Sequence, residues 1–327
     1  MTKQLARISP SSLVDCAIFP KELSLKGCFF QGENPRLVRK CVSEGGEYLS
    51  YIQTLVVVSL RATEILNMNA VEAPFTALHR MQRLRDIKIH YIPLTATMLD
   101  QLCEVLSTRL YNVELWWCSY PMRYTVQQAV LKIHKLEYGV DHENPPPRET
   151  TKMLASIIER SLSSIVVLTL SWNLDLLAYF GEMPRLTSLS VLSYLARNNE
   201  DLRDFLVANP QLANFGLEGH FDDLALLLPR SVLPNLRTIR GRTDLMQHLV
   251  PGRPVERVEI LDSPSFKFMA NGVRVLSHSA APIVELTLQL YYCRTRLSKI
   301  LDAVVEAVPH LERMILSFHV EVRNVLF

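Results

Sequence analysis

Histidine and cysteine are the residue types best suited to metal binding and nucleophilic catalysis, and this 327-residue chain has nine of the first and six of the second. The nearest approach to a ligand set is His134 with His142, alongside Asp141 and Glu143. A metal site needs three or four convergent ligands, so we interpret this group as solvated side chains. The sequence also lacks the glycine-rich phosphate motifs, the HExxH zinc motif and the GxSxG nucleophile elbow. We predict no enzyme activity, no metal and no cofactor.

The cysteines also bear on the compartment, because none of them forms a C-x-x-C pair and most lie in apolar stretches, as buried free thiols do. The six are Cys16, Cys28, Cys41, Cys103, Cys118 and Cys293. The first residues, MTKQLARISPSSLVDC, lack the apolar run of a signal peptide, and no segment has the roughly 18 apolar residues of a membrane span. These features predict a reducing, intracellular location, cytoplasmic or nuclear or both.

Charge is balanced along the chain, with 35 basic and 33 acidic residues and a formal net charge of +2. No long run of one sign marks a segment that would bind nucleic acid or an anionic membrane. We therefore predict no nucleic-acid or membrane partner and a protein partner recognised by shape and local chemistry.

The elements that would position a binding site form a repeat. The pattern L-x-x-L-x-L, with other large apolar residues allowed, recurs at a mean spacing of about 26 residues, which is typical of leucine-rich repeats. Its eleven clear copies begin at Ile52, Leu84, Leu110, Ile133, Ile165, Leu186, Leu212, Leu236, Val255, Ile283 and Leu311, and PKELSL from Pro20 is a weaker first copy.

A proline lies two residues ahead of four of these copies, at Pro184, Pro210, Pro234 and Pro309. Proline cannot continue a helix and biases its predecessor toward extended backbone, so it marks the return from helix to strand. Segments with helical periodicity lie between the predicted strands: they start at Thr97, Thr151, Glu200 and Arg296. In the last of them we expect one buried apolar stripe made of Leu297, Ile300, Leu301, Val304, Val305 and Val308.

The sequence therefore predicts an α/β leucine-rich-repeat solenoid, a horseshoe of about 11–12 strand-turn-helix repeats with a parallel sheet on its concave face. The stretch from Gly139 to Thr151 contains three successive prolines and is predicted to be an exposed loop on the rim. It is either an ordinary connection between repeats or part of a binding surface.

Side chains alternate along a strand, so the residues between the buried ones should face the concavity. The candidate partner-binding residues there are Lys88, His90, Glu114, Trp116, Arg240, Arg242 and Glu259. Either Trp116 or its neighbour Trp117 should face outward, where a tryptophan is a common anchor of an interface, unless it fills the core. Arg240 and Arg242, with Arg237 nearby, could hold a carboxylate or a phosphorylated side chain, or could simply be solvated.

Two segments carry a resemblance to a family: DLRDFLVANPQLANFGLEG, and the run from Leu233 to Ile260. They resemble the fungal F-box/leucine-rich-repeat proteins over roughly Ile52 to Ser317. The resemblance implies a substrate-recognition component of an SCF-type ubiquitin ligase, with the Skp adaptor as a further partner. The F-box itself is absent or truncated: residues 1–19 are a candidate remnant of its join, and residues 20–327 form the predicted solenoid. The alternative is a stand-alone leucine-rich-repeat scaffold with no ligase connection.

Overall fold

The computed structural model describes residues 21–26, 46–59, 68–121, 124–139, 148–171, 177, 180–194, 199–219, 228–229, 231–261, 266–291 and 297–319. The N-terminal segment 1–19 lies outside these residues. The chain divides into two compact units, Met1–Gln128 and Ala129–Phe327, called unit 1 and unit 2 below.

Unit 1 contains four strands that pair in parallel, each with the next along the chain. They are β1 (Glu22–Lys26), β2 (Thr54–Val58), β3 (Asp86–His90) and β4 (Tyr111–Trp116). The helical segments between them are η2 (Gly46–Tyr51), α2 (Met68–Thr76), η3 (Leu78–Arg80) and α3 (Ala96–Leu106).

Unit 2 contains eight strands, again parallel and paired in chain order. They are β5 (Ile133–Gly139), β6 (Val167–Ser171), β7 (Ser188–Tyr194), β8 (Asn214–Gly219), β9 (Thr238–Gly241), β10 (Arg257–Ile260), β11 (Glu285–Tyr291) and β12 (Arg313–His319). Its helices are α4 (Arg148–Glu159), α5 (Asn199–Ala208), α7 (Thr243–Leu249), α8 (Phe266–Val275), η5 (Leu276–His278) and α9 (Leu297–Ala307).

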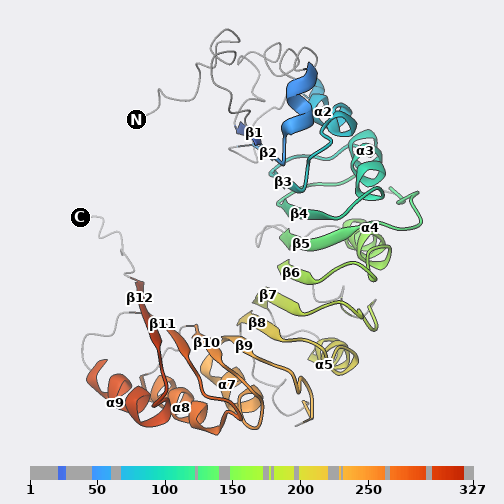
Figure 1. The fold of residues 1–327 in the computed structure, drawn as a ribbon. Helices are drawn as coiled ribbons and strands as arrows, with labels where there is room; N and C mark the ends of the chain where they lie inside the picture. Colours follow the sequence, from blue (N-terminus) through green and yellow to red (C-terminus); the bar gives the residue numbers. More distant parts are fainter. Residues whose placement is uncertain are drawn as a thin grey trace, which may run out of the picture. The chain divides into compact units, whose positions relative to one another are not determined.

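These elements confirm the predicted leucine-rich-repeat fold. Each of the twelve predicted copies of the pattern contains or leads into one of the twelve strands, and the four predicted helical segments correspond to α3, α4, α5 and α9. Within each unit the helices lie along one side of the strands (Figure 1). A strand returning parallel to its predecessor requires a crossover. A helical segment supplies it between most of the strands, whereas the described residues between β4 and β5 contain no helix. The curvature of the whole array stays a prediction.

The pattern works because its three apolar positions are all buried. In the repeat of β3, Leu84 precedes the strand and Ile87 and Ile89 lie within it, and all three side chains are 0% exposed. Burial of each such side chain contributes roughly 1.5–3 kcal/mol. The residues between them keep an intermediate or high exposure, so one face of each strand belongs to the core and the other does not.

The prolines ahead of the strands lie where tight turns need them. Pro184, Pro210, Pro234 and Pro309 each occupy the second position of a turn whose fourth residue donates its backbone N–H to the carbonyl of the first. Proline fixes a φ near −65°, which that position of a type I or II turn requires. The sequence rule for the start of a repeat is thus a rule about turn geometry.

Buried polar side chains tie successive repeats of unit 2 together at these turns. Asn209 is 0% exposed, and its amide accepts from the Met183 backbone N–H at 2.8 Å and donates to the Phe205 carbonyl at 2.8 Å. Arg253 is 3% exposed and its Nε donates to the Val232 carbonyl at 2.7 Å. Burial lowers the pKa of the Arg253 guanidinium from its usual range. Each side chain satisfies carbonyls that would otherwise be buried without a donor.

Two details of the sequence-based prediction were wrong. The buried stripe of α9 includes Ala303 and Ala307, whereas Val305 is 75% exposed. Val305 lies five residues after buried Ile300, which on a helix is well away from the same face. The loop predicted from Gly139 to Thr151 is also too long, because Gly139 ends β5 and α4 begins at Arg148. Residues 140–147, with the three prolines, lie outside the described residues.

Candidate functional site

The candidate site lies on what we call the strand face, the set of strand side chains that alternate with the buried ones and point away from the helices. The structure places six of the seven predicted residues there: Lys88 and His90 on β3, Glu114 and Trp116 on β4, Arg240 on β9 and Glu259 on β10. The strand period alone therefore assigned these side chains to the correct face.

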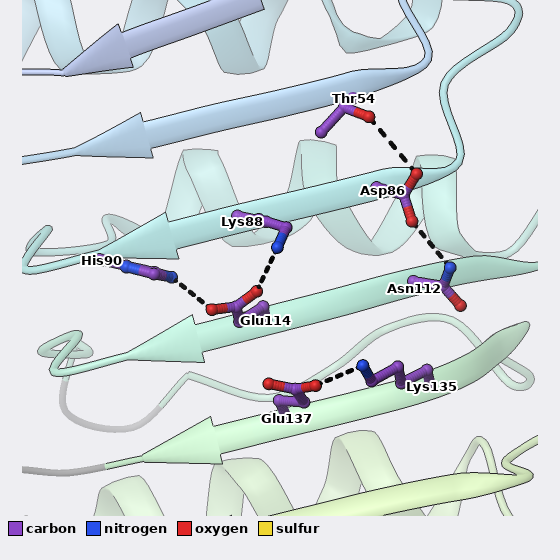
Figure 2. Close-up of polar contacts among 8 residues, drawn as sticks. All are labelled: Thr54, Asp86, Lys88, His90, Asn112, Glu114, Lys135 and Glu137. Atoms are coloured by element: carbon purple, nitrogen blue, oxygen red, sulfur yellow. Dashed lines mark hydrogen bonds and ion pairs between the residues drawn. The ribbon is translucent and has the colours of Figure 1, made fainter. Parts of the chain in front are cut away.

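Lys88, His90 and Glu114, called the Glu114 cluster below, form a connected polar group on β3 and β4. Glu114 Oε2 lies 2.9 Å from Lys88 Nζ, and Glu114 Oε1 lies 2.9 Å from His90 Nε2 (Figure 2). Glu114 is directly opposite Lys88 in the register, whereas His90 is opposite Trp116 and reaches Glu114 diagonally. The Glu114 and His90 side chains are about one-fifth exposed, so the cluster is both ordered by contacts and open to solvent.

Asp86 begins the same face at the amino-terminal end of β3. Its carboxylate accepts from the Asn112 side-chain amide at 2.7 Å and from the Thr54 hydroxyl at 3.4 Å. These bonds join three neighbouring strands through side chains alone, as Figure 2 shows. Asp86 is thus held by neutral donors, in contrast to Glu114, which lies against the Lys88 ammonium and the His90 ring.

Trp116 is the outward residue at the carboxyl end of β4, and it belongs to an aromatic cluster with Tyr91 and Trp117. The Tyr91 and Trp117 rings stack with centroids 4.7 Å apart and planes 7° apart. The Trp116 ring lies 5.3 Å from that of Trp117, tilted by 44°. All three side chains are partly exposed. The sequence left open which tryptophan faces outward, and the structure assigns the strand-face position to Trp116.

The stack depends on an unusual backbone. Tyr91 directly follows β3 and Trp117 directly follows β4, and both have positive φ, 57° and 54°. The left-handed region costs a non-glycine residue about 1–2 kcal/mol. No sequence signal marks these two residues as a pair, because neither is a glycine or asparagine.

Cys118 directly follows Trp117 in the chain and is buried with a free thiol. Its Sγ donates to the Ile89 carbonyl at 3.3 Å. Burial raises the pKa of the Cys118 thiol from 9.0 to about 12, which outweighs the backbone hydrogen bonds that lower it. The thiol is therefore protonated and unreactive at neutral pH. Cys103 is also buried and is not part of a disulfide.

In unit 2 the strand face of β5 carries a pair of its own. Lys135 Nζ lies 2.5 Å from Glu137 Oε1, two residues along the same strand (Figure 2). The strand face of β6, of the first part of β7 and of the first part of β8 presents uncharged side chains. They include Thr169, Ser188, Ser190 and Asn214, with Gly216 at the equivalent place on β8.

Further along unit 2, a set of ion pairs crosses the strand face from β8 to β12, and we call it the unit 2 ladder. Arg240 lies between two carboxylates, with NH2 2.6 Å from Glu218 Oε1 and Nε 3.3 Å from Glu259 Oε2. Glu259 also accepts from the Gln289 amide at 2.8 Å. The remaining members are Arg257 and Arg313, which flank Glu285 at 3.8 and 3.5 Å.

The ladder changes the interpretation of the predicted basic spot. Arg240 is already engaged by two glutamates, and exposed Arg237 lies 3.4 Å from Glu256. Arg242 is not a strand residue: it follows β9 and precedes α7 in extended backbone, with intermediate exposure. The three arginines therefore do not converge as one free basic patch. Glu218 was missing from the prediction, although the same alternation along β8 indicates it.

The described residues contain no group of three or more His, Cys, Asp or Glu side chains placed to hold a metal ion. His134 lies on β5 and is partly exposed, while Asp141, His142 and Glu143 fall outside the described residues. Among the helices that the structure describes, none has both the length and the apolar content to cross a membrane.

Comparison with known proteins gives a fold-level likeness. No protein-family model matches the sequence, and no curated protein matches it. Among solved structures, the chain is similar to the leucine-rich-repeat-containing protein LegL7 from Legionella pneumophila, with 14% sequence identity and a TM-score of 0.48. That similarity covers 90% of this chain and 91% of LegL7.

Proposed function

We propose that this chain is a protein-binding scaffold and that its strand face holds the partner. The observation that carries the proposal is the outward row of β3 and β4, where Lys88, His90, Glu114 and Trp116 lie on two paired strands, partly exposed and mutually ordered. Contacts ordered before binding lower the entropic cost of association. A partly exposed tryptophan beside ordered charges has the composition of an interface hot spot.

Charge supports a protein partner over nucleic acid. On β3 and β4 the acids Asp86 and Glu114 accompany Lys88, and the unit 2 ladder matches three arginines with three glutamates. A surface that follows a phosphate backbone needs an excess of lysine and arginine. A protein surface with mixed charge fits this balance better.

The experiment begins with proteins captured by the full chain and identified by mass spectrometry, each then purified so that its Kd can be measured directly. We expect Trp116→Leu to weaken binding by about 2 kcal/mol, roughly thirtyfold. The matched control is Glu104→Ala, an exposed residue of α3 in the same unit but on the helix side. Binding that survives Trp116→Leu and Lys88→Glu but is lost with Glu104→Ala would place the partner on the helices and reject the proposal.

A narrower role comes from the sequence resemblance alone: recognition of substrates for an SCF-type ubiquitin ligase. We infer it because residues between Ile52 and Ser317 resemble the fungal F-box/leucine-rich-repeat proteins in the regular order of helix, proline and strand within each repeat. Its test is co-purification of the folded chain with the Skp adaptor. Absence of that complex, with partner binding intact, would favour the stand-alone scaffold.

A further inference from the structure

The strand face of unit 1 combines an aromatic ring and a carboxylate at a spacing that suits a planar cation. We propose that it binds an arginine side chain of the partner, with the guanidinium over the Trp116 ring and against the Glu114 carboxylate. This inference rests on the proposed function and specifies the chemistry of the partner.

The spacing follows from the strand. Trp116 and Glu114 are two residues apart on β4 and point to the same face, which places their Cα atoms about 7 Å apart. His90 is opposite Trp116 in the register but turns toward Glu114, with its Nε2 2.9 Å from Oε1. The tryptophan ring and the carboxylate thus border the same stretch of the face.

Glu114 has acceptor capacity for a further donor. A carboxylate offers about four lone-pair positions, and the contacts with Lys88 and His90 engage one oxygen each. The Lys88 side chain is 46% exposed, so its ion pair is weak and an arginine fork can displace it. The local charge favours a cation as well, because on β3 and β4 the two carboxylates of Asp86 and Glu114 accompany one ammonium group, that of Lys88.

The aromatic side of the site is rigid. The Trp116 ring contacts that of Trp117, which stacks on Tyr91, and both Tyr91 and Trp117 have left-handed backbone. Residues in this conformation persist only where the surrounding structure holds them, and they concentrate at ligand sites. A cation binds more strongly over the face of a tryptophan ring than over that of another aromatic ring. The planar guanidinium of arginine can also stack on the ring.

The test uses a phage-displayed library of random dodecapeptides selected on the full chain, followed by Kd measurements with synthetic peptides. We expect the selected peptides to contain arginine, and replacement of that arginine by lysine to weaken binding about tenfold. We expect Trp116→Leu to weaken the parent peptide about thirtyfold and Glu114→Gln about tenfold. Glu104→Ala, on the helix side of unit 1, is the control and should not change the Kd.

Three results separate the two proposals. Selected peptides that are acidic or lack arginine, yet lose binding with Trp116→Leu, would overturn the arginine assignment and leave the strand-face scaffold intact. Peptides and partners that bind all strand-face variants equally would overturn both. If Trp116→Leu does not fold, Glu114→Gln decides, because it removes the charge and keeps the shape; an unchanged Kd would then reject the site.

Discussion

The strand faces of the two units are built from the same repeat but differ in what they present. The face of β3 and β4 in unit 1 carries the Glu114 cluster next to an exposed tryptophan. The unit 2 ladder consists of arginines and glutamates that engage one another from β8 to β12. The parallel strands are shared, so the difference lies in the outward side chains and in the left-handed residues that follow β3 and β4.

This difference separates a surface suited to recognition from one that largely satisfies itself. In the ladder each charge already has an opposite neighbour, and an incoming group must replace those contacts. In unit 1 the Trp116 side chain is still partly exposed, so a partner that buries the rest of its apolar surface gains free energy of binding. We therefore expect binding energy to concentrate in unit 1 and the ladder to influence orientation and association rate.

The repeats of unit 2 are held in order by buried side chains such as Arg253, and loss of this side chain should have the largest effect. Arg253→Ala removes a buried guanidinium that donates to the Val232 and His248 carbonyls. Leaving these carbonyls without a donor should lower the free energy of unfolding by about 3 kcal/mol, measured as a shift of the urea midpoint. Arg257→Ala is the control, because its side chain is 63% exposed and should cost less than about 0.5 kcal/mol. Equal midpoints for the two variants would contradict this account.

Local opening of unit 1 next to the aromatic cluster can be measured from the accessibility of the Cys118 thiol. Since burial raises its pKa to about 12, the thiol should react with iodoacetamide at pH 8 at least about 100-fold more slowly in the native chain than in urea. Mass spectrometry of the peptide that contains Cys118 gives both rates. Rapid labelling of the native protein would show that the region around Cys118 opens readily, and it would argue against a preorganised site.

The same thiol predicts a direction for the pH dependence of stability. The folded state keeps the thiol proton up to about pH 12, whereas the unfolded chain releases it near 9.0. The contribution of the buried thiol to the free energy of unfolding is therefore fully present below pH 9 and decreases as the pH rises above 9. Urea midpoints at pH 8 and pH 10 should fall more steeply for the wild type than for Cys118→Ala. Parallel slopes would mean that the thiol does not contribute.

The smallest effects concern the ion pairs themselves. Double-mutant cycles on Lys88–Glu114 in unit 1 and Arg240–Glu218 in unit 2 should each give coupling energies below about 1 kcal/mol, because all four side chains are at least one-fifth exposed. High salt should reduce both. A coupling above about 2 kcal/mol for Arg240–Glu218 alone would mean that the ladder stabilises unit 2 substantially, and would sharpen the contrast between the two faces.

The amino-acid sequence by itself determined the repeat. Apolar spacing located all twelve strands, and the prolines marked four of the turns, because burial of one strand face and the φ of proline are local properties. The alternation along each strand also identified six of the seven candidate residues as facing outward. Arg242 is the exception, since β9 ends at Gly241 and α7 follows at once.

Tertiary structure decided which outward residues meet. Arg240 contacts Glu218 and Glu259, about 20 residues away in either direction, and only the register between β8, β9 and β10 sets them side by side. The stack of Tyr91 on Trp117 depends in addition on two left-handed residues that no local preference predicts. Periodicity reports whether a side chain is inside or outside, whereas ion pairing and stacking depend on register and backbone angles between separate repeats.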